Sequence, residues 1–92
     1  MCGIVGVLGL DGAPVSRLLL EEMTRTIAHR GPEDVGVWQS SAAASPVGLG
    51  HARLKIIDLS PAAGQPMRSD DGAIVVTFNG EIYNYRELRA RL

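Results

Sequence analysis

The chain has 92 residues, of which 46% are hydrophobic and 21% charged, and its formal net charge is −1. These values are typical of one small globular domain and exclude a disordered chain. The mixed charges supply no basic patch for nucleic acid or an anionic membrane surface, and no apolar run approaches the ~20 residues of a membrane span.

In chain order, the first expected element is a buried strand over residues 2–10, which is short, apolar and punctuated by glycines. A helix is then expected to begin after the N-cap residue Ser16 and to end at residues 31–32, a Gly-Pro pair. Its apolar side chains repeat every four residues along one face: Leu19, Met23 and Ile27. A strand over residues 35–39, a loop over 40–45 and a further strand within 47–58 follow.

Residues 60–71 contain two prolines and two acidic residues, and we expect a surface loop there. Residues 73–78 form the strongest strand pattern in the chain. The Asn79 and Gly80 pair after it is the best short hairpin signal, and it predicts a return strand over 81–83. Asn84 and Glu87 resemble a capping box that opens a short final helix.

Cys2 is the single cysteine and directly follows Met1. Its small side chain allows an aminopeptidase to remove Met1, which leaves a thiol and an α-amine of pKa near ~8 on one residue. A nucleophile that carries its own base suits covalent catalysis. The alternative is a small buried hydrophobe in a core strand.

The numbers of cysteines and histidines limit the possible disulfides and metal sites. One cysteine cannot form an internal disulfide, and one cysteine with two histidines is too few for a closed zinc site. The start of the chain lacks the positive charge and long apolar core of a signal peptide. We therefore expect a cytoplasmic protein, where a reducing environment suits a reactive thiol, and no metal site.

Three further segments combine polar side chains with turns. Residues 29–34 read as an ordinary helix C-terminus, where His29 and Arg30 favour the helix dipole. Arg53 lies in an apolar strand, and its guanidinium either reaches the surface or grips a substrate carboxylate. The Asn79 amide and the Gly80 N–H could donate to an oxyanion, and Glu81 could pair with a substrate ammonium. This function is compatible with a hairpin turn.

Together these motifs resemble the N-terminal glutaminase domain of class II glutamine amidotransferases, and most closely the glutamine-dependent asparagine synthetases. The matching pieces occur in the family's order and cover the chain from end to end. They are MCGIVG at 1–6, HRGPEDVG at 29–36, GHARLKIIDLS at 50–60, the QPM turn at 65–67 and FNGEIYNYRELR at 78–89.

The resemblance implies an α+β fold of the N-terminal nucleophile hydrolase type, an αββα sandwich of which this chain holds the N-terminal part. It implies that Cys2 attacks the side-chain amide of glutamine, and that Asn79 and Gly80 form the oxyanion hole. The glutamine would be bound by Arg53 at its α-carboxylate, by Glu81 at its α-ammonium, and by the main chain of Ile56 and Ile57. His29, Arg30 and His51 are interpreted as structural.

The family's glutaminase domain is longer than 92 residues, so residues 1–92 are expected to be its N-terminal part, inactive alone and without the synthetase domain. The implied partners are L-glutamine, a C-terminal synthetase domain and a further copy in a homo-oligomer, with no nucleic acid and no membrane. No cofactor is expected for the glutaminase part; ATP and magnesium belong to the synthetase domain. The ammonia acceptor would be one such as activated aspartate. The alternative is a non-catalytic truncated fragment or oligomerising module.

Overall fold

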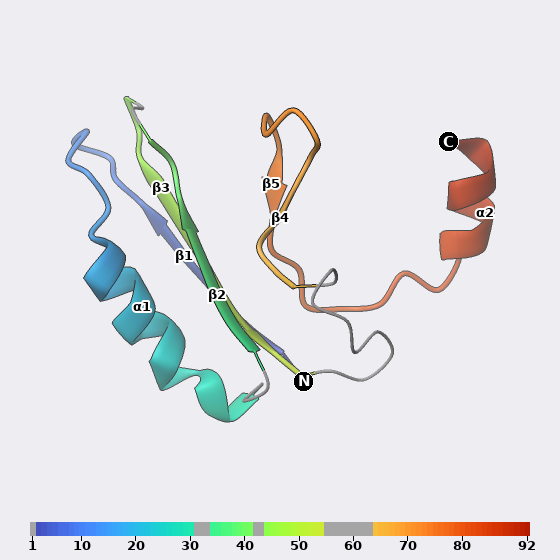
Figure 1. Ribbon diagram of the computed structural model, residues 1–92, viewed down its shortest axis with the longest axis horizontal. Coiled ribbons are helices and arrows are strands. Elements are labelled where there is room, and N and C mark those ends of the chain that lie inside the picture. The colour runs from blue at the N-terminus through green and yellow to red at the C-terminus, as the bar shows by residue number, and fades with distance from the viewer. Residues whose placement is uncertain (1, 31–33, 42–43, 55–63) are drawn as a thin grey trace.

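The computed structural model describes residues 2–30, 34–41, 44–54 and 64–92. A three-stranded antiparallel sheet lies at its centre, with helix α1 on one side and a small two-stranded hairpin on the other (Figure 1). The C-terminal helix α2 stands farthest from the sheet. The described residues therefore form an α+β arrangement with antiparallel sheets, as the sequence predicts, whereas the complete αββα sandwich stays a prediction.

The central sheet has the strand order β1–β3–β2, with β1 at Gly3–Leu8, β2 at Asp34–Gln39 and β3 at Val47–Arg53. Gly3 is opposite Ala52 and Asp34 is opposite Arg53, so the starts of β1 and β2 and the end of β3 lie at one end of the sheet. The strands expected over 35–39 and within 47–58 are confirmed. The loop expected over 40–45 joins them, apart from residues 42–43, which lie outside the described residues.

The first strand is half-buried, so the prediction of a buried strand over 2–10 is wrong for one of its faces. Its side chains alternate between partly covered and exposed positions. Ile4 is 51% exposed and Leu8 is 57% exposed on the face that points away from α1. Since successive side chains of a strand point to opposite faces, α1 covers only half of this apolar segment.

Helix α1 spans Arg17–Thr26, and Ser16 caps it as predicted, because its Oγ accepts a hydrogen bond from the Leu19 N–H at 3.2 Å. Of the apolar face expected at Leu19, Met23 and Ile27, the last two are half-buried. The expectation is wrong for Leu19, which is 50% exposed, whereas Leu20 is 0% exposed. The helix lies close over β3 at two glycines. A Cβ added at Gly48 would lie 3.1 Å from a methyl carbon of Leu20, and one at Gly50 would collide with the Thr24 hydroxyl.

The helix ends earlier than predicted. Ile27 is its C-cap, and the 3-10 turn η1 continues over Ala28–Arg30. The predicted end at residues 31–32 lies outside the described residues. Neither α1 nor α2 is long and apolar enough to cross a bilayer.

The hairpin differs from the one that the sequence predicts. Its strands are β4 at Met67–Arg68, inside the expected loop over 60–71, and β5 at Val75–Val76. The turn between them contains Gly72 at φ 72°, whereas neither Asn79 nor Gly80 has the positive φ that a type I′ turn needs. Residues 81–83 do not form the expected return strand.

Helix α2 spans Tyr85–Arg91, close to the predicted place. Asn84 is its N-cap, but the Asn84 side chain makes no capping hydrogen bond, so the predicted capping box is wrong. None of the residues of α2 is buried. This helix therefore gains little from packing against the part of the chain that the structure describes.

Candidate functional site

The thiol of Cys2 lies where β1 begins and β3 ends. Its Sγ accepts a hydrogen bond from the Leu54 N–H at 3.3 Å and lies 3.8 Å from the Leu54 carbonyl oxygen. The side chain is half-buried and free of any disulfide. The sheet thus fixes the position of the sulfur while leaving it partly accessible to a small molecule.

Arg53 is the last residue of β3, adjacent to Leu54, and only 5% of it is exposed. In the register of the sheet it lies opposite Asp34. Alternation along β3 places Arg53 on the same face as His51, two residues earlier. The same alternation, continued one residue beyond Gly3, assigns Cys2 to this face, which we call the site face.

His51 occupies the middle of the site face, opposite Ile4 on β1 and Gly36 on β2. It is 1% exposed, and its Nε2 lies 3.2 Å from the carbonyl oxygen of Phe78. Since a carbonyl can only accept, Nε2 carries the hydrogen and donates it. Nδ1 is buried without a hydrogen-bond partner among the described residues.

Burial lowers the pKa of His51 from its ordinary value of 6.5. The positive charge of Arg53 adds to this lowering, whereas the Phe78 carbonyl and the charge of Asp34 oppose it. The imidazole is therefore neutral at neutral pH, in the tautomer that donates to Phe78.

The segment with Asn79, Gly80 and Glu81 is exposed between β5 and α2. It is tied to the site face through the residue before it: the Phe78 carbonyl accepts from His51, and the Phe78 N–H donates to the Gln65 Oε1 at 2.6 Å. Two side chains distant in sequence thus hold Phe78, the residue just before the predicted oxyanion donors.

The structure brings some of the predicted site residues together. Cys2 and Arg53 lie at the adjoining ends of paired strands, and the start of the Asn79 segment is anchored two residues from Arg53 along β3. Glu81 is exposed, and Ile56 and Ile57 lie outside the described residues. His29 and Arg30 lie in η1 and are exposed, and their interpretation as structural residues stays a prediction.

Sequence reasoning missed the hydrogen bond between the Gln65 side chain and the Phe78 N–H, because it treated Gln65 only as part of a turn. A polar residue before a proline in a loop carries no signal for a contact thirteen residues away. It also left His51 without a partner, although a histidine in an apolar strand is a residue for which a buried hydrogen bond can be sought.

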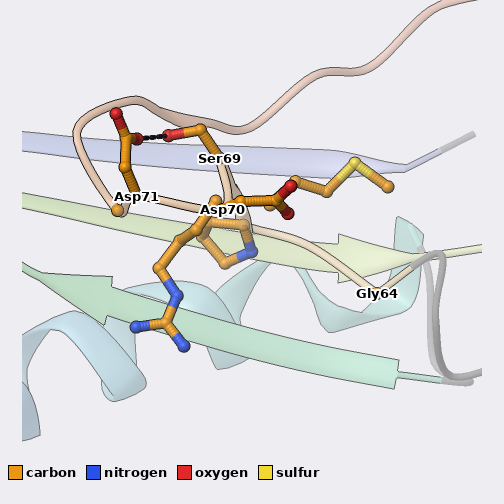
Figure 2. A pocket seen from close by; sticks show the side chains of 8 residues that line it. Gly64, Ser69, Asp70 and Asp71 are labelled. Atoms are coloured by element: carbon orange, nitrogen blue, oxygen red, sulfur yellow. Dashed lines mark hydrogen bonds between the residues drawn. The ribbon is translucent and has the colours of Figure 1, made fainter.

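A hollow in the described residues lies elsewhere, against the β4–β5 hairpin. It has a volume of about 620 Å³ and is lined by Gly64 and residues 66–72. Figure 2 shows the hydrogen bond across its rim, where the Ser69 hydroxyl donates to the Asp71 carboxylate at 2.7 Å. This bond, together with the Ala73 N–H, lowers the pKa of Asp71. None of the predicted glutamine-binding residues lines this hollow.

The described residues hold no group of three or more His, Cys, Asp or Glu side chains that could bind a metal ion. The groups on and beside the site face are a thiol, a guanidinium, an imidazole and backbone amides. Those groups suit attack on a carbonyl carbon in a substrate that carries a carboxylate.

Comparison with known proteins identifies the family of the chain. The family described as "Glutamine amidotransferase domain" matches residues 1–92. The chain therefore belongs to the glutamine amidotransferase domain family. No solved structure shows significant similarity to the chain.

Among named proteins, the chain is similar to asparagine synthetases described as glutamine-hydrolysing. It is 47% identical to asparagine synthetase 1 of Arabidopsis thaliana and 48% identical to the Asparagus officinalis enzyme, each over 94 residues that cover 100% of this chain. It is 38% identical to a putative asparagine synthetase of Methanocaldococcus jannaschii over 99% of the present chain. The chain spans 15% of the two plant proteins and 20% of the archaeal one.

Proposed function

We propose that this chain provides the glutaminase half-reaction of an asparagine synthetase-like amidotransferase. The Cys2 thiol attacks the side-chain amide of L-glutamine, forms a thioester and releases ammonia for an acceptor such as activated aspartate. The observation that carries the proposal is the placement of Cys2 beside the end of β3, where Arg53 lies and where the Asn79 segment is anchored.

Substrate binding falls to the charged residues of the site. Arg53 binds the α-carboxylate of glutamine through a charge-assisted, forked contact, and Glu81 pairs with the α-ammonium. The main chain of Ile56 and Ile57 adds contacts to the same glutamine. These interactions exist before and during the reaction, so they set the affinity for glutamine more than the rate of the chemical step.

The chemical step begins when the α-amine of Cys2, exposed by removal of Met1, takes the thiol proton through water. The sulfur adds to the amide carbon, and the resulting oxyanion accepts hydrogen bonds from the Asn79 side chain and the Gly80 N–H. Collapse of this adduct breaks the carbon–nitrogen bond, and the nitrogen leaves as ammonia with the proton taken from the thiol. Water then hydrolyses the thioester to glutamate and restores the thiol.

The proposal includes a fold and partners. The sheet, with α1 on one face and the β4–β5 hairpin beyond the other, fits one half of an αββα sandwich with the active site between its two sheets. A synthetase domain that uses ATP and magnesium would consume the ammonia. No cofactor takes part in the glutaminase step, and the reducing cytoplasm suits its free thiol.

The test is covalent labelling of the protein at its natural length with a diazo-ketone analogue of glutamine. Intact mass should show loss of Met1 and one added label, and peptide mapping should place the label at residue 2. Cys2→Ala should lose both the label and ammonia release from glutamine. Ammonia-dependent synthesis should persist in this variant, because the two reactions occupy separate sites. A label elsewhere, or active protein that retains Met1, would contradict the mechanism.

A second candidate is a module that associates with other chains but turns over no glutamine. The observation that favours it is the apolar surface: Ile4 and Leu8 are exposed on the site face, and no residue of α2 is buried. Ammonia release from glutamine by the protein at its natural length separates the candidates, because only the glutaminase releases ammonia. The same assay together with sedimentation on residues 1–92 tests whether this segment acts alone. We expect self-association without turnover from this segment alone, whereas turnover by a stable monomer would make it a complete enzyme.

A further inference from the structure

Phe78 has both of its backbone polar groups bound by side chains from other parts of the chain. The His51 Nε2 donates to its carbonyl at 3.2 Å, and the Gln65 Oε1 accepts from its N–H at 2.6 Å. Because a peptide bond is planar, fixing the Phe78 carbonyl also fixes the direction of the Asn79 N–H. Only the φ and ψ angles of Asn79 then separate this fixed plane from the Gly80 N–H.

The two binding side chains are themselves fixed on the sheet. His51 is 1% exposed in the central strand, directly opposite Gly36 on β2. The Gln65 backbone lies against that same glycine, where a Cβ would collide with the Gln65 carbonyl oxygen. Gly36 and His51 therefore form a cross-strand pair that holds Phe78 at two points. His51 binds the Phe78 carbonyl directly, and Gly36 gives room to Gln65, which binds the Phe78 N–H.

The Phe78 ring completes the arrangement on the far side of Asn79. A Cβ added at Gly80 would lie 2.7 Å from the Phe78 Cζ, so the ring lies against the Gly80 backbone. A Cβ at position 80 would displace the ring from this contact. The ring thereby limits the rotations of Asn79 that would turn the Gly80 N–H away.

We propose that His51 and Gln65 are positioning residues for glutamine hydrolysis, and that they act together by holding the Phe78 peptide so that Asn79 and Gly80 present their donors to the oxyanion. The proposal rests on the glutaminase function proposed above. It assigns His51 a role in the rate of the reaction, beyond the purely structural one that the sequence suggests. Neither residue needs to touch glutamine.

The first test compares steady-state glutamine hydrolysis by the natural-length protein and its variants. Loss of one oxyanion donor costs ~10²–10³ in rate, and loss of its support should cost part of this. We expect His51→Leu and Gln65→Leu each to lower kcat about 10- to 100-fold, with the KM for glutamine within about twofold. His51→Gln keeps an N–H donor and Gln65→Glu keeps an acceptor, so both should recover most of the rate.

The double variant separates a shared role from two independent ones. If both side chains act on one peptide, His51→Leu with Gln65→Leu should be little slower than the slower single variant. Gly36→Ala should resemble Gln65→Leu, because the new Cβ displaces the Gln65 backbone. Gly6→Ala is the matched control, since Gly6 lies in the same sheet with nothing within 4 Å of an added Cβ. It should leave both constants unchanged.

Hydrogen exchange of residues 78–82, followed by mass spectrometry, tests the positioning without using activity. Exchange of the Phe78 amide, which donates to Gln65, should accelerate in the two leucine variants and stay at the wild-type rate in His51→Gln and Gln65→Glu. Unchanged exchange, a raised KM at constant kcat, or multiplicative losses in the double variant would each overturn the proposal. A wild-type protein without Cys2-dependent hydrolysis, but with the expected exchange pattern, would refute the glutaminase function while leaving the hold on Phe78 established.

Discussion

Replacing Leu20 by alanine should destabilise the sheet and its helix far more than the same change at the neighbouring Leu19. Leu20 is 0% exposed, and its methyl carbons lie where a Cβ at Gly48 would be 3.1 and 3.4 Å away. Leu-to-Ala changes at fully buried positions cost about 2.7–5 kcal/mol, since the cavity collapses only partly. A hydrogen-bonded strand beneath the helix resists collapse, so we expect about 3 kcal/mol. Leu19 is 50% exposed, and its truncation should cost less than about 1 kcal/mol.

Native-state hydrogen exchange of the α1 and β3 amides measures the difference in stability between the two variants. It reports the local stability of these elements, so it can be used on the protein at its natural length. A loss of about 3 kcal/mol corresponds to roughly 150-fold faster exchange, and a loss below 1 kcal/mol to less than about fivefold. Leu18→Ala, at another exposed position of α1, serves as a further control. Faster exchange in the Leu19 variant than in the Leu20 variant would refute the orientation of the helix on the sheet.

Three other changes have defined outcomes. Ser16→Ala should lower the stability of α1 by about 1 kcal/mol, measured by hydrogen exchange of the α1 amides, because it removes a cap hydrogen bond. Asn84→Ala removes no such bond and should have a smaller effect on α2. Burial lowers the pKa of His51 in the folded protein. As the pH falls below 6.5, His51 is therefore protonated in the unfolded chain before it is protonated in the folded one. Stability should therefore be complete above pH 6.5 and decline as the pH falls toward the folded pKa, and denaturant titrations of His51→Gln should show less of this decline. Arg53→Ala should raise the KM for glutamine and Asn79→Ala should lower kcat; an unchanged KM in the first would remove Arg53 from the carboxylate contact.

Local patterns were sufficient for most elements but not for the orientation of α1. The sequence places the start of α1 and the strands β2 and β3 correctly, because a cap residue and alternating apolar positions act within a few residues. Three consecutive leucines at 18–20 leave the phase of the helix undetermined. That phase depends on Gly48 and Gly50, which leave room for Leu20 and Thr24, and those glycines lie in another element.

The hairpin error has a similar cause. Asn79 and Gly80 carry a strong local turn signal, but the Phe78 backbone is already bound by Gln65 and His51 and needs no return strand. Long-range hydrogen bonds thus overrode the local preference. In the site, the proximity of Cys2 to the end of β3 follows from strand pairing, whereas the roles of Arg53 and Glu81 toward glutamine stay predictions.

The strand order β1–β3–β2 also has a consequence for biosynthesis. The central strand is the last of the three to leave the ribosome, because Arg53 is made roughly 45 residues after Leu8. At ~5–20 residues per second, β1 waits about 2–9 s for its partner. During that interval neither outer strand can complete its hydrogen bonds, and Leu54 cannot yet donate to the Cys2 sulfur. The segment at Cys2 is therefore accessible to other molecules before the sheet closes around it.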